Sequence, residues 1–262
     1  MKAAVILFPG VNCEHETKRA LESAGIPADI VRWNNPKGLE TYDGYVLAGG
    51  WSYEDRVRAG VISAQDPIMN IIREQADAGK PVLGICNGAQ VLLETGMVPG
   101  IKPGEVEMAL APNINPLVSG YYCTWVRMKN NAERRRCAFT KFVDRNEVIP
   151  VPIAHAEGRF VTKDKELINR LIANNQIIFK YCKKDGGDAE GFPDNPNSSM
   201  YNMAGICNPK GNVLAMMPHP ERANWARQVP YYEARPFTDM ESPGPCRKIF
   251  QSMGSFMEEM KG

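Results

Sequence analysis

The sequence predicts an α/β fold: an open, mostly parallel sheet with helices on both faces. Two observations predict it. Strand-like and helix-like segments alternate through the first half of the chain, which is typical of parallel sheets. The strand-like segments are continuously apolar, as strands covered on both faces require. A length of 262 residues and an apolar content of 44% suffice for a core of ordinary size.

The elements of the first half follow one another in regular order. Gly25 and Gly79 stand where two helices would end, because glycine accepts the left-handed conformation that closes a helix. Pro67 fits a first helical turn, where its missing N–H is not needed. We expect strands at 3–8, 28–33, 42–50 and 81–86, and helices at 13–25, 63–79 and 87–96.

The second half is less regular. Gly, Pro, Asn and Asp crowd residues 184–200, which predicts a loop. The sequence contains no repeat and no obvious linker, so we predict a single domain over 1–262 with a C-terminal extension from about 223. We expect strands at 121–129, 147–155, 176–182 and 212–220, and a surface helix in the last segment, 244–262.

Composition narrows the class of protein. Lys and Arg number 31 and Asp and Glu number 30, so no net basic field favours nucleic acid or anionic lipid. The seven cysteines include no C-x-x-C and the histidines number three, so we expect neither a disulfide framework nor a metal site. The N-terminal apolar run at 3–8 is too short for a signal peptide. We therefore expect a cytoplasmic protein.

One stretch, "PVLGICNGAQVLLETG" at 81–96, places Cys86 between a strand and a helix. Gly84 and Gly88 flank it at equal spacing, as a tight strand-to-helix turn requires. The helix N-terminus beneath the thiol favours the thiolate and can also stabilise an oxyanion. We therefore interpret Cys86 as a nucleophile and the other six cysteines as small buried core residues.

A thiol nucleophile needs a base and a group that orients the base. His219 lies in "MMPHPER", and the prolines on either side of it predict an extended segment. Residues two apart then face the same side, so Glu221 would orient the His219 imidazole and stabilise its charged form. His15 lies among charges and is interpreted as solvated. For His155, a structural role and a place at the rim of the site remain equally open.

The motifs resemble a known family. "GICNGAQ" fits the G-x-C-x-G-x-Q elbow of class I (triad) glutamine amidotransferases, and "PHPE" resembles their His-x-Glu pair. More specifically, "FPGVNCEHE", "LAGGWSYEDRVRAG" and "PIAHAEGRF" resemble the glutaminase subunits of phosphoribosylformylglycinamidine synthases. The matching blocks extend from residue 8 to 222. The resemblance implies a class I amidotransferase domain with a flavodoxin-like or Rossmann-like sheet.

The sequence departs from this family at three places. The family usually reads G-G-F-S-Y-G-D, whereas this chain has Trp51 for the Phe and Glu54 for the later Gly. The turn at Glu54 must therefore accommodate a Cβ atom. Ala89 replaces a bulkier residue. All three positions belong to the rim of the expected pocket.

The resemblance implies that glutamine is the substrate. Cys86 would attack the side-chain amide, and the oxyanion would lie between the backbone N–H groups of Gly50 and Asn87. His219 would protonate the departing ammonia and then activate water to release glutamate.

The family further suggests which residues contact the substrate. Gln90 follows the nucleophile on the first helical turn, and His155 and Glu157 would approach the backbone groups of glutamine.

Ammonia must reach its acceptor without leaving the protein, because it becomes ammonium in water. The chain has no phosphate-binding fingerprint, so we expect no cofactor in it. By resemblance, ATP and Mg belong to a large synthetase subunit that aminates formylglycinamide ribonucleotide in purine synthesis. A small bridging subunit is a further candidate partner. Aromatic residues of the tail fit a docking surface and a packed core equally well; these are Trp225, Tyr231, Tyr232 and Phe237.

Three alternatives remain open. The chain could serve another amidotransferase whose acceptor is chorismate or a nucleotide, although the blocks at 51–60 and 152–160 count against this. It could be a non-hydrolytic thiol sensor or chaperone on the same elbow, although the base in such folds usually follows the nucleophile closely. It could also be an inactive scaffold, against which the intact Cys86, His219 and Glu221 argue.

Overall fold

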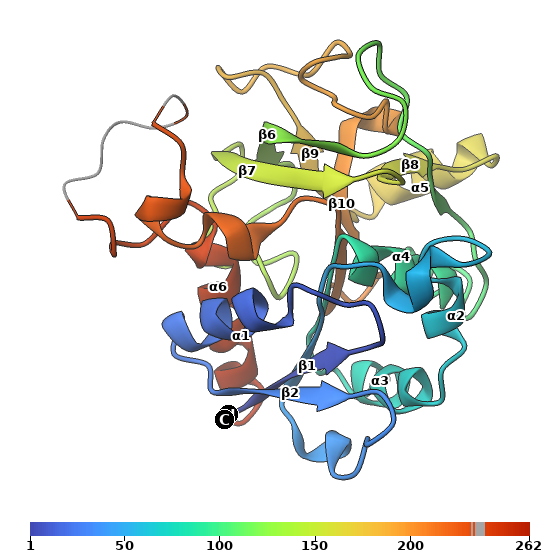
Figure 1. The fold of residues 1–262 in the computed structure, drawn as a ribbon, viewed down its shortest axis with the longest axis vertical. Helices are drawn as coiled ribbons and strands as arrows, with labels where there is room; N and C mark the ends of the chain where they lie inside the picture. Colours follow the sequence, from blue (N-terminus) through green and yellow to red (C-terminus); the bar gives the residue numbers. More distant parts are fainter. Residues whose placement is uncertain (232, 234–238) are drawn as a thin grey trace.

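The computed structural model describes residues 1–231, 233 and 239–262. This part of the chain has the α/β fold that the sequence predicts (Figure 1), with a nine-stranded sheet in the order β2-β1-β3-β4-β11-β10-β9-β6-β7. The strands are β1 (Ala3–Leu7), β2 (Ala28–Arg32), β3 (Gly44–Leu47), β4 (Val82–Ile85), β6 (Tyr122–Asn130), β7 (Val148–His155), β9 (Ile177–Tyr181), β10 (Met203–Cys207) and β11 (Val213–Met216). Two short strands, β5 (Ala109–Ala111) and β8 (Arg159–Val161), form a separate pair.

The sheet has a parallel half and an antiparallel half. Strands β2, β1, β3, β4 and β11 pair in parallel. Strands β10, β9, β6 and β7 continue the sheet with antiparallel pairs. Because β4 lies between β3 and β11, the segments that follow these three strands meet at one edge of the sheet, where open α/β sheets bind ligands.

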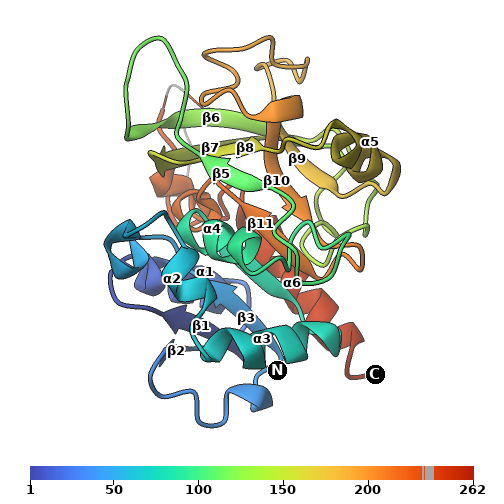
Figure 2. The same cartoon turned by 90° about the vertical axis from the view of Figure 1, so that its right-hand side faces the viewer.

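Helices cover both faces of the parallel half (Figures 1 and 2). The helices α1 (Glu14–Ser23) and α6 (Arg247–Glu259) contact each other on one face. On the other face lie α3 (Ile68–Asp77) and α4 (Asn87–Glu94), and α4 packs against β3, β4 and β11. None of the helices in the described residues is both long and apolar enough to cross a membrane.

The expected elements correspond closely to the observed ones, with one helix wrongly joined. The segment 63–79 forms two helices, α2 (Val61–Ala64) and α3, with Pro67 between them as the N-cap of α3. Two features explain the break between the helices. Asp66 accepts a hydrogen bond from the Ile68 N–H at 3.1 Å, and Pro67 disfavours the helical backbone conformation at the residue before it. The strands β5, β8 and β10 and the helix α5 (Lys165–Ala173) were not expected from the sequence.

The C-terminal helix is more than a surface helix, because one face of it is buried. Ile249, Phe250, Met253 and Met257 recur at helical spacing and are at most 1% exposed. Burying a side chain of this size stabilises a fold by about 1.5–3 kcal/mol. This face of α6 is therefore part of the hydrophobic core.

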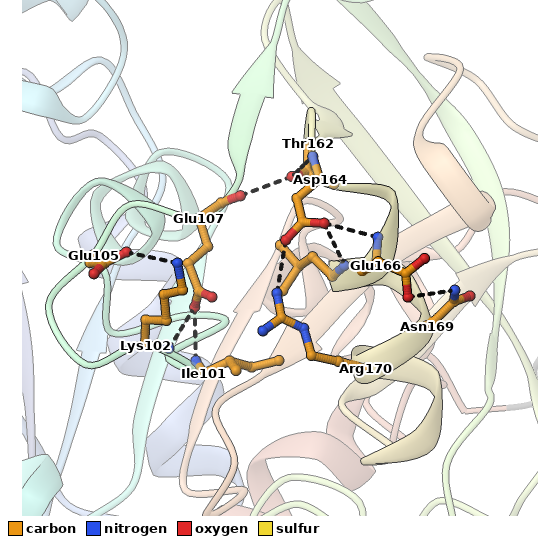
Figure 3. A network of polar contacts seen from close by, with 10 residues as sticks. Ile101, Lys102, Glu105, Glu107, Thr162, Asp164, Glu166, Asn169 and Arg170 are labelled. Atoms are coloured by element: carbon orange, nitrogen blue, oxygen red, sulfur yellow. Dashed lines mark hydrogen bonds and ion pairs between the residues drawn. The ribbon is translucent and has the colours of Figure 1, made fainter.

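The helix α5 begins at a capping residue whose loss we expect to be measurable. Asp164 accepts hydrogen bonds from the Glu166 and Leu167 N–H groups at 2.9 and 3.2 Å and from Arg170 at 2.8 Å. Figure 3 shows Asp164 between Glu166 and Arg170 in this network. Asp164→Ala should lower the free energy of unfolding by about 1 kcal/mol in urea denaturation. Asp164→Asn, which keeps the capping oxygen, should lose less. Equal stability of all three proteins would contradict this.

Candidate active site

Cys86 joins β4 to α4 in a strained backbone conformation, with φ 51° and ψ −105°. Such strain costs about 1–3 kcal/mol and persists where the surroundings enforce it, often at functional sites. The flanking glycines permit the turn: a Cβ on Gly84 would lie 2.6 Å from the Gly88 oxygen, and one on Gly88 only 2.0 Å from the Leu47 oxygen. The predicted elbow is therefore present.

His219 and Glu221 form a buried pair beside the elbow. His219 Nδ1 lies 2.6 Å from Glu221 Oε1, and the two side chains are 2% and 0% exposed. The imidazole and the Cys86 thiol line the same pocket; His219 Nε2 has no hydrogen-bond partner in the described residues, and Cys86 Sγ lies 3.5 Å from the Ala154 oxygen. The three side chains thus lie in the order nucleophile, imidazole and carboxylate that a triad requires.

The prediction that the backbone stays extended through Glu221 was wrong. The strand β11 ends at Met216, and residues Pro220–Ala223 form a tight 3-10 turn. His219 itself is extended, with φ −101° and ψ 89°. The turn that starts at Pro220 brings the Glu221 carboxylate back toward the imidazole.

The charge of His219 is set by its neighbours. Burial lowers the pKa of His219, but the Glu221 carboxylate and the adjacent thiols raise this pKa well above its usual range. The imidazolium is therefore favoured at neutral pH, which gives the pocket of Cys86 a positive charge.

Two backbone N–H groups near Cys86 are available to an oxyanion. The end of β3 is held by hydrogen bonds from Asn12 N to Gly49 O at 3.2 Å and from Trp51 N to Gly10 O at 2.9 Å. Gly50 lies between them, and its own N–H donates to no backbone or side-chain acceptor in the described residues. Asn87 N–H starts α4 and is likewise without such a bond.

The side chains of Asn87 and Gln90 organise the other side of the site. Asn87 Nδ2 donates to Asp55 Oδ1 at 3.1 Å and to Gln90 Oε1 at 2.9 Å. Asn87 Oδ1 accepts from the Ser52 N–H at 3.1 Å. Gln90 Nε2 donates to the Glu157 backbone oxygen at 2.7 Å. This network fixes Asp55 and Glu157 relative to the nucleophile.

His155 is structural and also reaches the site. It is 3% exposed, and its Nδ1 lies 3.1 Å from Asn113 Oδ1, which also accepts from the Gly158 N–H. Burial, followed by the charge of His219, lowers the pKa of His155 to about 3. It is therefore neutral and holds the loop that carries Glu157.

A single pocket collects most of the expected residues. Its lining includes the expected Gly50, Cys86, Gln90, His155, Glu157 and His219. Glu221 lies behind His219. Trp51 and Tyr121 line it too and pack against each other, with their ring centroids 5.8 Å apart. The tryptophan that replaces the usual phenylalanine therefore sits at the rim, as the sequence indicated.

The thiol and the two charged side chains of the lining that were missed from sequence are Cys13, Asp55 and Arg222. Arg222 donates to the Cys13 sulfur at 3.0 Å, and this sulfur lies within 4.8 Å of a His219 ring nitrogen. Cys13 is buried as expected, yet it belongs to the pocket rather than to the core alone. Cys13 and Asp55 lie within the motif blocks that carried the resemblance and Arg222 directly follows "PHPE", which was the signal available.

Other expectations had mixed outcomes. Cys123 is exposed, so its interpretation as a buried residue was wrong. Cys123 lies in the first part of β6, which has no β9 neighbour because β9 pairs only with residues 128–130 of β6. His15 is solvent-exposed, as expected.

The aromatic residues of the tail do not form one cluster in the described residues. Trp225 lies against the guanidinium groups of Arg227 and Arg247, at 4.9 and 5.4 Å from its ring centroid. Tyr231 is 78% exposed. Tyr232 and Phe237 lie outside the described residues.

One set of donors could bind a metal ion. The ligand atoms of Cys13, His219 and Glu221 lie within 4.8 Å of one another. In the structure, however, the imidazole and the carboxylate are hydrogen-bonded to each other. The arrangement is that of a base and its orienting group.

Comparison with known proteins gives the family. Residues 1–257 match the model of the CobB/CobQ-like glutamine amidotransferase domain. The chain belongs to this glutamine amidotransferase family. The amidotransferase is 48% identical to the phosphoribosylformylglycinamidine synthase subunit PurQ of Methanothrix thermoacetophila, over 100% of both chains. It is 42% identical to the subunit of the same name from Pyrococcus furiosus, over 86% of this chain and 90% of the relative.

Solved structures support the same family. The structure of PurLQS from Thermotoga maritima matches the amidotransferase with a TM-score of 0.73 and 30% identity over 98% of both chains. Another glutamine amidotransferase from Thermotoga maritima matches with a TM-score of 0.51 and 16% identity, over 99% of this chain and 97% of that one, which shows the fold alone. Among the alternatives from sequence, family membership favours an amidotransferase over a thiol sensor.

Proposed function

We propose that this amidotransferase is the glutaminase subunit of a phosphoribosylformylglycinamidine synthase. One observation carries the glutaminase part: the buried His219–Glu221 pair shares a pocket with Cys86 and with the Gly50 N–H, which has no acceptor in the described residues. The acceptor follows from the relatives named above, the first of which matches over the full length of both chains.

Acylation is the first half of the reaction. The Cys86 thiolate attacks the side-chain amide carbon of glutamine, and the C–S bond forms as the carbonyl oxygen becomes an oxyanion. The Gly50 and Asn87 N–H groups stabilise that charge, and one such donor is typically worth about 3 kcal/mol. The His219 imidazolium protonates the amide nitrogen, the C–N bond breaks, and ammonia leaves a γ-glutamyl thioester.

Deacylation restores the enzyme. Neutral His219 takes a proton from water, and the hydroxide attacks the thioester carbon. The C–S bond breaks, glutamate leaves, and Cys86 returns to the thiolate beside the imidazolium. Glu221 holds the ring in one tautomer throughout, through the contact at Nδ1.

The substrate contacts are also part of the proposal. Gln90 and Glu157 lie on the same wall of the pocket and are joined by the hydrogen bond from Gln90 Nε2 to the Glu157 backbone oxygen. We propose that they contact the backbone groups of glutamine. His155 lines the pocket and positions the Glu157 loop through Asn113.

The ammonia would pass to a synthetase subunit that supplies the ATP and Mg chemistry, since we propose no cofactor for this chain. A small bridging subunit is a further candidate partner. All seven cysteines are free, which fits a reducing compartment, and we propose the cytoplasm.

The acceptor is tested by reconstitution. The chain is combined with the synthetase subunit of the same organism, glutamine, ATP and Mg, and transfer of glutamine nitrogen is measured with three acceptors: formylglycinamide ribonucleotide, xanthosine monophosphate and chorismate. We expect amination of formylglycinamide ribonucleotide alone. Transfer to either of the other acceptors, or glutamine-dependent transfer in the absence of the chain, would overturn the proposal.

A further inference from the structure

Two carboxylates that take no part in the bond-making and bond-breaking steps line the same pocket. Asp55 lies on the loop after β3 and Glu157 on the loop after β7, and both line the pocket that contains Cys86. Burial, followed by the negative charge of Glu157, raises the pKa of Asp55 to about 6. The two side chains are therefore close enough to repel each other.

No basic side chain in the described residues neutralises this pair. Arg56 and Arg58 flank Asp55 in the sequence, but Arg56 pairs with Glu54 and Arg58 pairs with Glu94. Within the described part of the chain, neither Asp55 nor Glu157 has a cationic nitrogen within 4.0 Å. Like charges in a partly buried site are costly unless a cation accompanies them.

The protein holds Asp55 in place despite local strain. Tyr53, Glu54 and Asp55 have φ values of 53°, 59° and 51°, a left-handed run in which each side chain is unfavourable. The run includes Glu54, where the family usually has glycine. The hydrogen bond from Asn87 Nδ2 holds Asp55 Oδ1 at 3.1 Å, and Asp55 Oδ2 accepts no hydrogen bond within the described part of the chain. Strain of this kind, enforced by the surroundings, is typical of ligand-binding positions.

We propose that Asp55, together with Glu157, receives the α-ammonium group of glutamine and thereby determines the preference for an α-amino acid amide. This inference rests on the proposed glutaminase function. When the amide carbon of glutamine lies at Cys86, its other end must occupy the remainder of the same pocket. A cation at that end is the complement to two uncompensated carboxylates.

The test compares two substrates on matched variants. Glutaramate has the same side-chain amide and carboxylate as glutamine but lacks the α-amino group. Ammonia release is measured with the full chain and its synthetase partner, and kcat/KM is determined for both amides. Asp55→Asn should lower kcat/KM for L-glutamine by about 10- to 100-fold, the effect of one hydrogen bond to a charged group. The same variant should keep kcat/KM for glutaramate within about twofold of the wild-type value, because the contact concerns only the ammonium group.

Two further variants keep the test decisive. Glu190→Gln, an exposed carboxylate that pairs with Lys183 and lies outside the pocket, should leave kcat/KM for both substrates unchanged. Glu157→Gln should also reduce the preference for glutamine. If Asp55→Asn lowered kcat/KM equally for both substrates, or for neither, the inference would be overturned. If the wild-type complex hydrolysed no glutamine at all, the proposed function itself would fail, which is a separate result.

Discussion

Replacing Cys86 with serine is expected to lower kcat for glutamine hydrolysis by about 10³-fold or more. The thiolate is the nucleophile of a cysteine triad, whereas a serine hydroxyl beside His219 is not ionised and is the weaker nucleophile. Losing the nucleophile of a triad removes most of its catalytic effect. Ammonia release in the presence of the synthetase partner measures the loss.

Cys123→Ser is the matched control, because this cysteine is exposed and lies on β6 outside the pocket. Its activity should equal that of the wild type. Glutaminase activity in Cys86→Ser comparable to the wild type would show that another group, such as the Cys13 thiol, is the nucleophile.

Glu221→Gln is expected to lower kcat by about 10²- to 10⁴-fold with little change in fold. The carboxylate helps to raise the pKa of His219 against the effect of burial, so its neutralisation should bring that pKa down. The imidazolium then loses its proton at a lower pH. The alkaline limb of the pH profile of kcat/KM should therefore move toward lower pH.

Glu241→Gln provides the comparison for this prediction. Glu241 is exposed and pairs with Arg227, away from the pocket. Its pH profile should match that of the wild type. An unmoved alkaline limb in Glu221→Gln would mean that His219 does not depend on the carboxylate 2.6 Å away.

The parts of the site that could be predicted from sequence are those whose residues are close together along the chain. The elbow at Cys86 depends on glycines two residues to either side, and the His219–Glu221 pair is separated by one residue. Even there, the backbone path was misjudged, because a 3-10 turn and an extended segment can both bring such a pair together. Residue spacing alone does not distinguish these conformations.

Asp55 and Arg222 could not be placed in the site by spacing. Each lies on a different loop, and the two come near Cys86 only because the segments after β3, β4 and β11 meet at one sheet edge. The separate β5–β8 pair was missed as well, because two strands of three residues each give no clear alternating pattern. The break at Pro67 was visible in sequence but outweighed by the helical pattern around it.

Covalent labelling tests the central claim most directly. The full chain, with and without its synthetase partner, is treated with a glutamine analogue that carries an electrophilic carbon in place of the side-chain amide, and peptide mapping locates the adduct. We predict one adduct, on Cys86, blocked by excess glutamine. An adduct on Cys13 instead, or none with the partner present while a small neutral reagent still alkylates Cys86, would contradict the assignment of this pocket to glutamine.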